Sequence, residues 1–531
     1  MKNGVTTRVA AAVALCTLGL GAATFAVAAP AGTLIDAAES QQQQAALKLI
    51  AGGADARAKD VDGTTALHWA AHYADAELAD KLIRAGADVN AANDYGSSPM
   101  MEAATVGSAE VLTLLLKAGA DVESTNQEGQ TALMAVARTG NVEAATVLLK
   151  KGAKVDAVEQ WGGQTALHWA AAQSQPAMVQ LLIKHRADVN ARAAVRDWQR
   201  RVTAEGRPKN MNRGGLTPLL YAAREGCIEC AKHLLKAKAD INLADPDEVT
   251  PLVLALTNMR FDIAAMLIEA GADVNKWDFF GRTPLYSAVD LNTLPRGGRP
   301  DLPSTDRLSG YDIEEMLLKK GANPNFQLKL RPPYRNGVYD RGGDQVISTG
   351  ATPLLVAAKV GDAKSVALLL KYKAIVDLPN TDGVTPLMAA AGVGQGFNPT
   401  RGRYKTDAQA AECLRLLKEA GGNVNAKTDS GLTALHAAAS LGWDGTIKML
   451  VADGAQLEAL DNKGLTPIDY AVGRHERGFL EPEHTRRDSS VTILKDYIVA
   501  ATGRAPKEFS GTLNKQTRGT GGAADQNTST R

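Results

Sequence analysis

Residue types that often define a chemistry are scarce in this chain of 531 residues. It has four cysteines, too few for a fold held together by a disulfide framework. Neither sign of charge is in excess, because 59 Lys and Arg offset 58 Asp and Glu, which excludes a uniformly basic nucleic-acid binder and an acidic solvating chain. Aromatic residues make up only 5%, but apolar residues reach 45%, which excludes a disordered chain. Long uncharged runs are lacking beyond the N-terminus, so several membrane spans are excluded too.

Small residues are abundant instead, with many alanines and 50 glycines, and this composition suits thin, closely stacked elements that repeat. One segment runs from Asp62 through Leu67-His68 to Asn90, and its pattern recurs along the chain. The anchoring Thr, once a Ser, falls at Thr65, Ser98, Thr131, Thr165, Thr217, Thr250, Thr283, Thr352, Thr385, Thr433 and Thr466. The base period is 33 residues, and the longer gaps are 33 residues plus insertions.

This unit resembles the ankyrin repeat, whose Thr-Pro-Leu-His and Gly-Ala-Asp signatures occur many times between about residues 33 and 501. Each position also has a physical reason. Thr217-Pro218 provides a capping hydroxyl followed by Pro at the first helical position, a strong helix start. Gly86 and its equivalents end the second helix, since Gly adopts the left-handed conformation at little cost.

One repeat cannot bury its own apolar faces, so the copies must stack. We therefore predict an all-α fold, an ankyrin-repeat solenoid of about 11 full helix-turn-helix repeats with β-hairpin fingers and a degenerate N-terminal cap. The predicted limits are a capping half-repeat at 33–61, the repeat domain at 62–501 and a disordered C-terminal tail at 503–531.

The N-terminus is typical of an export signal, predicted at 1–28. Lys2 and Arg8 precede an uncharged stretch, and Ala26-Val27-Ala28 offers a cleavage site of small residues. The alternative is an uncleaved membrane anchor, since 21 uncharged residues could just span a bilayer. The form of the signal indicates a bacterial protein that is periplasmic or secreted.

Insertions interrupt the repeats near 193–214, 292–310, 326–350, 393–407 and 473–488. Three of them are basic, with net charges of +4 at 193–214, +2 at 326–350 and +2 at 393–407. They favour a basic, aromatic-rich rim that binds an acidic partner, with candidate contacts at Trp198, Arg200, Arg201, Arg331, Tyr334 and Arg335. The alternative is a set of solvated loops tolerated at the edge of a solenoid.

The tips of the finger turns carry four aromatic residues, Tyr95, Trp161, Phe279 and Phe280. Exposed aromatic side chains are costly unless a partner covers them, and such residues dominate interface hot spots. We therefore consider these four as candidate partner-binding residues. The alternative is that they pack on an adjacent finger or insertion.

Catalytic motifs are absent from the sequence, and we expect no enzyme activity, no cofactor and no metal site. His68, His168 and His436 fill one slot of the repeat, where the ring is expected to bind the backbone of a neighbouring repeat. Cys227 and Cys230 have the spacing of a redox or metal half-site, and Cys230 falls in a slot that is apolar in other repeats. Two structural thiols are the preferred interpretation, with a local disulfide and catalysis as alternatives.

The function predicted from these features is a non-catalytic scaffold that binds a protein partner in the bacterial cell envelope. The chain is similar to periplasmic ankyrin proteins that accompany exported redox enzymes. One alternative is an envelope enzyme or carbohydrate-binding protein whose site is built from the insertions, with Asp306 among its candidate carboxylates. A secreted effector directed at a host is a further alternative.

Overall fold

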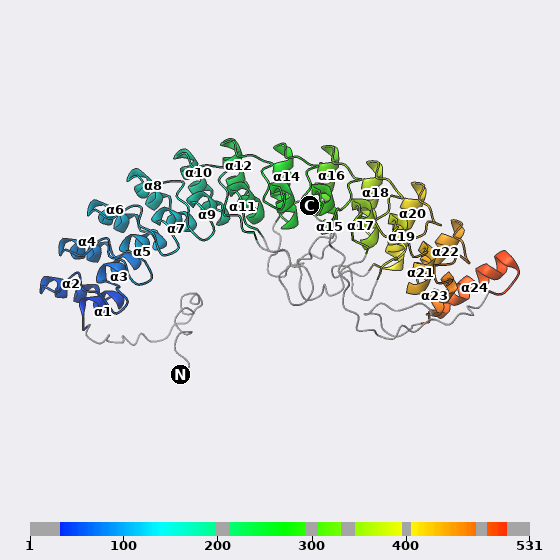
Figure 1. The fold of residues 1–531 in the computed structure, drawn as a ribbon, viewed down its shortest axis with the longest axis horizontal. Helices are drawn as coiled ribbons and strands as arrows, with labels where there is room; N and C mark the ends of the chain where they lie inside the picture. Colours follow the sequence, from blue (N-terminus) through cyan, green and yellow to red (C-terminus); the bar gives the residue numbers. More distant parts are fainter. Residues whose placement is uncertain are drawn as a thin grey trace. The chain divides into compact units, whose positions relative to one another are not determined.

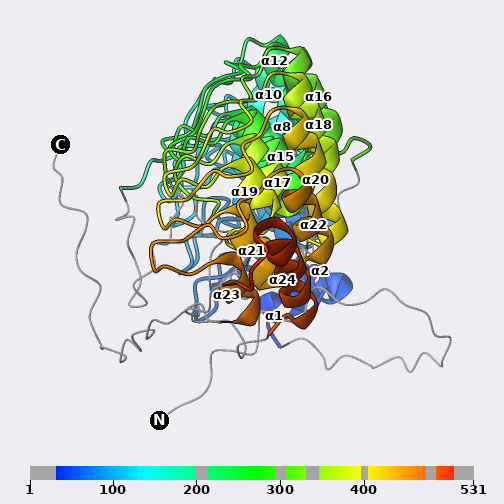
Figure 2. The ribbon, with the colours of Figure 1, turned by 90° about the vertical axis from the view of Figure 1, so that its right-hand side faces the viewer.

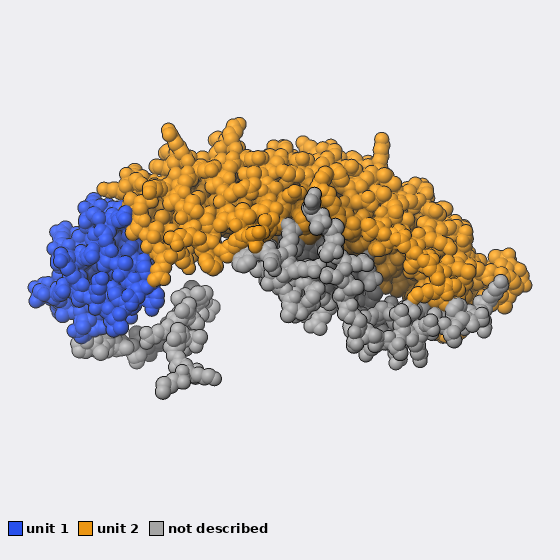
Figure 3. Space-filling view, viewed as in Figure 1, with its two compact units in different colours: residues 1–121 blue, residues 122–531 orange. Residues whose placement is uncertain are grey.

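The computed structural model describes residues 32–197, 213–292, 306–330, 346–395, 405–473 and 486–506 (Figure 1). The chain divides into two compact units, residues 1–121 and residues 122–531 (Figure 3). The described residues contain 24 helices, arranged as consecutive pairs. The predicted all-α ankyrin solenoid is therefore confirmed.

The first unit holds three helix pairs: α1 (Leu34–Glu39), α2 (Gln43–Ala51), α3 (Ala66–His72), α4 (Ala76–Arg84), α5 (Pro99–Val106) and α6 (Ala109–Lys117). The segment predicted as a capping half-repeat, 33–61, forms the complete pair α1 and α2. The side chain of Gln43 donates to Asp75 Oδ1 at 2.9 Å, so this polar helix is joined to the next pair by a hydrogen bond.

The second unit holds the remaining nine pairs: α7 (Ala132–Thr139), α8 (Val142–Lys150), α9 (Ala166–Ala172), α10 (Pro176–Lys184), α11 (Pro218–Glu225), α12 (Ile228–Lys236), α13 (Pro251–Thr257), α14 (Phe261–Glu269), α15 (Pro284–Asn292), α16 (Gly310–Lys319), α17 (Pro353–Val360), α18 (Ala363–Lys371), α19 (Pro386–Ala390), α20 (Asp407–Glu419), α21 (Ala434–Leu441), α22 (Asp444–Ala452), α23 (Pro467–Val472) and α24 (Asp488–Thr502).

The helices begin and end where the capping signals lie. The Thr217 hydroxyl accepts from the backbone N–H of Leu220 at 3.3 Å, and Pro218 occupies the first turn of α11. That helix ends at Gly226, which takes the left-handed conformation. Several second helices are capped in the same way, as at Ser108, whose hydroxyl accepts from the Val111 N–H at 3.3 Å.

Within the second unit, each odd-numbered helix packs on the next odd-numbered helix, and even-numbered helices form a second layer. The odd-numbered layer lies between the even-numbered layer and the finger turns (Figure 2). Fully buried alanines such as Ala222 and Ala223 allow the first helices to approach closely, and Leu234 fills the space between layers. Truncating one such leucine would cost about 2–5 kcal/mol.

The fingers are tight turns rather than the predicted β-hairpins. The Asp278 N–H donates to Arg282 O at 3.1 Å, and the Asp278 carboxylate accepts from the N–H groups of Phe280 and Arg282. The only strand-like pairs in the described residues are the isolated bridges Thr125–Thr131 and Val195–Gly214. The Gly281 N–H also donates to Asp278 O at 2.8 Å, so the backbone hydrogen bonds of this finger close a turn and do not extend into a ladder.

Neighbouring fingers are joined through their backbones. In the second unit the Phe279 N–H donates to Asp247 O and the Lys329 N–H donates to Phe280 O, both at 2.9 Å. Gly281 makes this approach feasible, because its φ is +81° and an added Cβ would lie 2.6 Å from Lys329 N. The fingers of consecutive repeats therefore form one continuous surface within this unit.

At the first and last insertions, a backbone hydrogen bond joins the segment that enters the insertion to the segment that leaves it. We call this pair of segments the neck of the insertion. Arg196 N–H donates to Arg213 O at 2.7 Å at the neck of the first insertion, and Arg487 N–H donates to Ala471 O at 2.8 Å at the last. The last helix therefore begins at Asp488, at the edge of the predicted insertion. Because the two ends of an insertion lie together at its neck, the 33-residue repeat pattern resumes after the insertion.

Candidate protein-interaction surface

Trp161 is the most exposed aromatic residue among the described fingers of the second unit, with 73% of its surface accessible. Its backbone is fixed, because the N–H groups of Trp161 and Gly162 donate to the buried Glu159 carboxylate. The Arg196 guanidinium lies 4.6 Å from the centroid of the Trp161 ring and donates to Trp161 O at 2.6 Å. Trp161 therefore presents an ordered aromatic face beside the neck of the first insertion.

A second aromatic group lies on the fingers of α14 to α17. Trp277 is partly exposed and packs edge-on against Phe326, with ring centroids 5.4 Å apart. The Lys329 ammonium lies 4.2 Å from the centroid of the Trp277 ring. Both groups thus pair an accessible aromatic ring with a cation at the start of a basic insertion.

Phe279 and Phe280 differ in exposure, which corrects the expectation that both rings are exposed. Phe279 is 36% exposed, whereas Phe280 is only 9% exposed. Phe280 lies edge-on to Phe279, and the Arg282 guanidinium lies 5.3 Å from its ring centroid. The backbone of Phe280 is also tied to the next finger, since Phe280 O accepts from the N–H groups of Lys329 and Leu330.

The first unit has its own exposed finger residue, Tyr95, with 68% of its surface accessible. On α3, Trp69 stacks against Tyr73, with ring centroids 5.9 Å apart. His72 lies edge-on to both rings, and its Nδ1 is 2.9 Å from the Glu102 carboxylate. The first unit therefore carries an aromatic cluster on α3 and an exposed tyrosine on a finger.

The other candidate contacts lie outside the described residues: Trp198, Arg200, Arg201, Arg331, Tyr334 and Arg335. The tail predicted at 503–531 and the signal predicted at 1–28 also lie outside them, apart from residues 503–506. None of the helices in the described ranges is long and apolar enough to cross a membrane.

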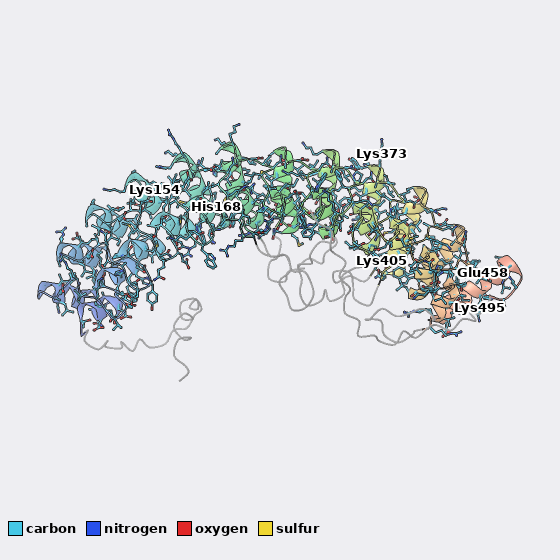
Figure 4. The ribbon with its side chains drawn as sticks, in the orientation of Figure 1. Lys154, His168, Lys373, Lys405, Glu458 and Lys495 are labelled. Atoms are coloured by element: carbon cyan, nitrogen blue, oxygen red, sulfur yellow. A yellow bond between two sulfur atoms is a disulfide. The ribbon has the colours of Figure 1, made fainter. Side chains whose placement is uncertain are left out.

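The three repeat histidines hold the stack together. His168 Nδ1 accepts from the Thr165 N–H at 3.0 Å, and Nε2 lies 3.1 Å from Ala191 O and 3.2 Å from Leu216 O. Burial lowers the pKa of His168 to about 4, so the ring is neutral at pH 7 (Figure 4). His68 and His436 make equivalent contacts, and burial lowers their pKa values as well.

Cys227 and Cys230 are joined by a disulfide, which corrects the preferred interpretation as two free thiols. The two residues occupy the N-cap and third positions of α12, and these positions are adjacent in space in any capped helix. Cys230 is fully buried, as its apolar slot predicts, and Cys227 is half-buried. Cys413 is a free, buried cysteine, and burial raises the pKa of its thiol to about 12.

Of the candidate carboxylates of an envelope enzyme, Asp306 lies within the described residues, and the others lie outside them. Asp306 accepts from the backbone N–H of Asp262 at 3.3 Å, which is a helix-capping role at α14. In the same ranges, no group of three or more His, Cys, Asp or Glu side chains is arranged to hold a metal ion.

Sequence reasoning missed three features that the structure brings together. Arg196 and Lys329 were counted only as charges of the insertions, although each covers an aromatic ring. Trp277 lies one residue before the finger turn, so a search restricted to turn tips does not find it. The third feature is the buried Lys405, whose ammonium donates to backbone carbonyl groups of two helices.

Comparison with known proteins agrees with this architecture. The family described as ankyrin repeats (3 copies) matches residues 34–126, 108–193, 219–296 and 406–480, and the single ankyrin repeat matches residues 349–381. These segments together span well over half of the chain.

Several eukaryotic proteins match parts of the chain. The nuclear factor NF-kappa-B p105 subunit of Gallus gallus is 33% identical over 31% of this chain and 14% of its own length. Alpha-latrotoxin-Lg1a of Latrodectus geometricus is 30% identical over 31% of this chain and 11% of its own length. Ankyrin repeat and SOCS box protein 16 of Mus musculus is 35% identical over 23% of this chain and 25% of its own length. The chain thus covers a quarter or less of each of these relatives, and what it shares with them is the repeat. With the capped helix pairs, the finger turns and the histidine contacts, these matches show that the chain belongs to the ankyrin-repeat family.

Proposed function

We propose that this chain is a non-catalytic scaffold that binds a protein partner through its finger surface and basic insertions. The observation that carries the proposal is the pairing of Trp161 with Arg196 at the neck of the first insertion. A large aromatic ring that is ordered yet exposed loses little conformational entropy on binding, and Trp and Arg are enriched in interface hot spots.

An acidic partner surface fits the charge of the chain. The insertion at 193–214 carries +4, although the whole chain carries only +1. The positive charge is therefore local, and it would speed association with an acidic protein in a salt-dependent way.

The cellular setting belongs to the same proposal. The positive residues, the uncharged stretch and the small residues before position 29 support export from a bacterial cell, to the periplasm or beyond. The likeness to exported ankyrin proteins that accompany redox enzymes rests on sequence pattern and is part of the proposal.

Capture from a bacterial envelope extract tests the role of the fingers. The baits are the full chain, Trp161→Ala, a variant with residues 198–212 replaced by a short turn, and Tyr372→Ala as a control. Tyr372 is a half-buried tyrosine at the C-cap of α18, away from the finger turns. Loss of about 2 kcal/mol, or roughly 30-fold in affinity, is expected for Trp161→Ala, with no loss for the control.

The excision variant separates the role of charge from that of the aromatic ring. If the insertion attracts an acidic partner, its removal slows association and flattens the dependence on salt. Capture that is equal for all four baits at every salt concentration would show that the partner binds elsewhere. A measured change in thermal unfolding of Trp161→Ala would assign the ring to packing instead.

A further inference from the structure

Cys227 and Cys230 form the one disulfide among the described residues, and partner binding through the fingers gives it no role. Cys227 lies in the turn between α11 and α12, and Cys230 lies in the first turn of α12, so their sequence separation is 3. Cys227 is the N-cap of α12, and its sulfur accepts from the Cys230 N–H at 3.3 Å.

Other repeats show that the fold does not need this crosslink. The same two positions hold Ser108 and Val111 in α6, and Asn141 and Ala144 in α8. In both helices the N-cap side chain accepts from the third N–H, at 3.3 and 3.0 Å, without any covalent bond. A reduced Cys227 can keep the same capping contact, so α12 is compatible with both oxidation states.

A structural role explains the disulfide poorly. Crosslinks stabilise mainly by closing long loops in the unfolded chain, and a loop this short gains the least. The two sulfurs also differ in access, since Cys230 is fully buried and Cys227 is half-buried. Only Cys227 can be approached from solvent.

The helix also favours a thiolate at Cys227. Its sulfur lies at the N-terminus of a nine-residue helix, where the unpaired N–H groups and the helix dipole stabilise negative charge. A Cys-x-x-Cys pair with one accessible thiol at a helix N-terminus is the arrangement in which thiol–disulfide exchange is fast and reversible.

We propose that Cys227–Cys230 is a redox-active disulfide that exchanges with external thiols at the Cys227 sulfur, while the repeat stays folded. A thiolate of the reductant bonds to Cys227 Sγ, the bond between Cys227 and Cys230 breaks, and Cys230 leaves as a thiolate that takes up a proton. A second reductant thiolate then attacks the reductant sulfur of this mixed disulfide and releases Cys227. Two electrons pass from two reductant thiols, which become a disulfide, to the cysteine pair.

Equilibration with glutathione tests the proposal on the full chain. The protein is incubated in buffers of increasing ratio of reduced to oxidised glutathione, acid-quenched and alkylated, and the modified cysteines are identified by peptide mass. We expect Cys227 and Cys230 to become alkylated together as the ratio rises, and to reform the disulfide when it falls. Cys413, a free and buried cysteine, is the internal control: because acid quenching unfolds the chain before alkylation, it should be alkylated to the same extent at every glutathione ratio.

Two variants identify the attacked sulfur, and each introduces a residue that another repeat carries at that position. Cys230→Ala, which matches Ala144 of α8, leaves Cys227 alone and should form a mixed disulfide with oxidised glutathione. Cys227→Ser, which matches Ser108 at the N-cap of α6, leaves the buried Cys230 and should react at least tenfold more slowly. Circular dichroism is recorded on each oxidation state and variant.

Three outcomes would overturn the proposal. The first is a disulfide that stays oxidised across the whole glutathione series and reduces only after denaturation. The second is reduction accompanied by loss of helix signal, which would make the crosslink structural. The third is equal glutathione reactivity of the two single-cysteine variants. None of these results depends on whether the fingers bind a partner.

Discussion

Replacing Lys405 with methionine should destabilise the repeats around α19, because this lysine is buried with its charge. It is only 5% exposed, and its Nζ donates to Ala389 O and Ala390 O at 2.7 Å and to Ala358 O at 3.3 Å (Figure 4). These oxygens belong to the last turns of α19 and α17. Ala389 O and Ala358 O also accept from the N–H groups of Gly392 and Gly361 at 3.2 Å, so Lys405 adds a second donor at these two carbonyls. Lys405 lies near the end of the insertion at 393–407, which follows α19, a helix of only five residues.

The magnitude follows from what methionine retains and what it loses. A methionine keeps most of the apolar stem, but it removes the ammonium, which also lies 5.5 Å from the centroid of the Trp443 ring. Each hydrogen bond from a charged donor contributes about 1.5–3 kcal/mol, and an unpaired buried carbonyl costs about 1–3 kcal/mol. The variant no longer carries the desolvation cost of burying the ammonium, which offsets part of this loss. We therefore expect a net destabilisation of about 2–4 kcal/mol.

Urea unfolding followed by circular dichroism, with amide hydrogen exchange to locate the effect, measures this change. Exchange should accelerate in α17, α19 and α20 and stay unchanged in the first unit, because repeat proteins lose stability locally. Lys364→Met is the matched control, since Lys364 is exposed on α18 and its replacement should change stability by less than about 0.5 kcal/mol. If Lys405→Met is as stable as this control, the ammonium does not stabilise the shortened helix and the argument fails.

Three further predictions concern packing and pH. Phe280→Ala should lower stability by about 3 kcal/mol and Phe279→Ala by less than about 1 kcal/mol, because only the Phe280 ring is buried. Thermal unfolding measures both losses, and equal losses would contradict the prediction. Burial raises the pKa of Glu314 from 4.5 to about 8, so its carboxyl binds a proton in the folded chain and the free energy of unfolding falls as pH rises through that range. Glu314→Gln should remove this fall. Urea midpoints measured at pH 5 and pH 8.5 for both proteins test it. Burial lowers the pKa of His168 from 6.5 to about 4, so the free energy of unfolding falls as pH drops through that range. His168→Gln should reduce this fall in urea unfolding, and a variant that loses as much stability in acid as the native chain would refute the assignment.

The period of the helices could be read from the sequence because its signals are local. A Thr or Ser, followed by Pro in several repeats as at Thr217, marks the start of a first helix. A residue with positive φ, most often Gly as at Gly271, follows a second helix. The same regularity located the insertions by arithmetic and predicted that His168 would bind backbone rather than a metal. Such signals depend only on residues close in sequence, so they can be recognised without the tertiary structure.

Other properties depend on residues that are distant in sequence, and only the tertiary structure decided them. Phe280 looked like an exposed tip residue, but its ring is buried and lies against Phe279 and Arg282. Trp161 acquires its ordered face from Arg196, 35 residues away, and Lys405 finds its carbonyl partners on two different helices. The disulfide is different, because Cys227 and Cys230 are three residues apart and the local N-cap geometry of α12 brings their sulfurs together. The sequence by itself therefore determined the repeat and its frame, whereas burial and charge pairing depended on how successive repeats pack, because packing joins side chains that no local pattern connects.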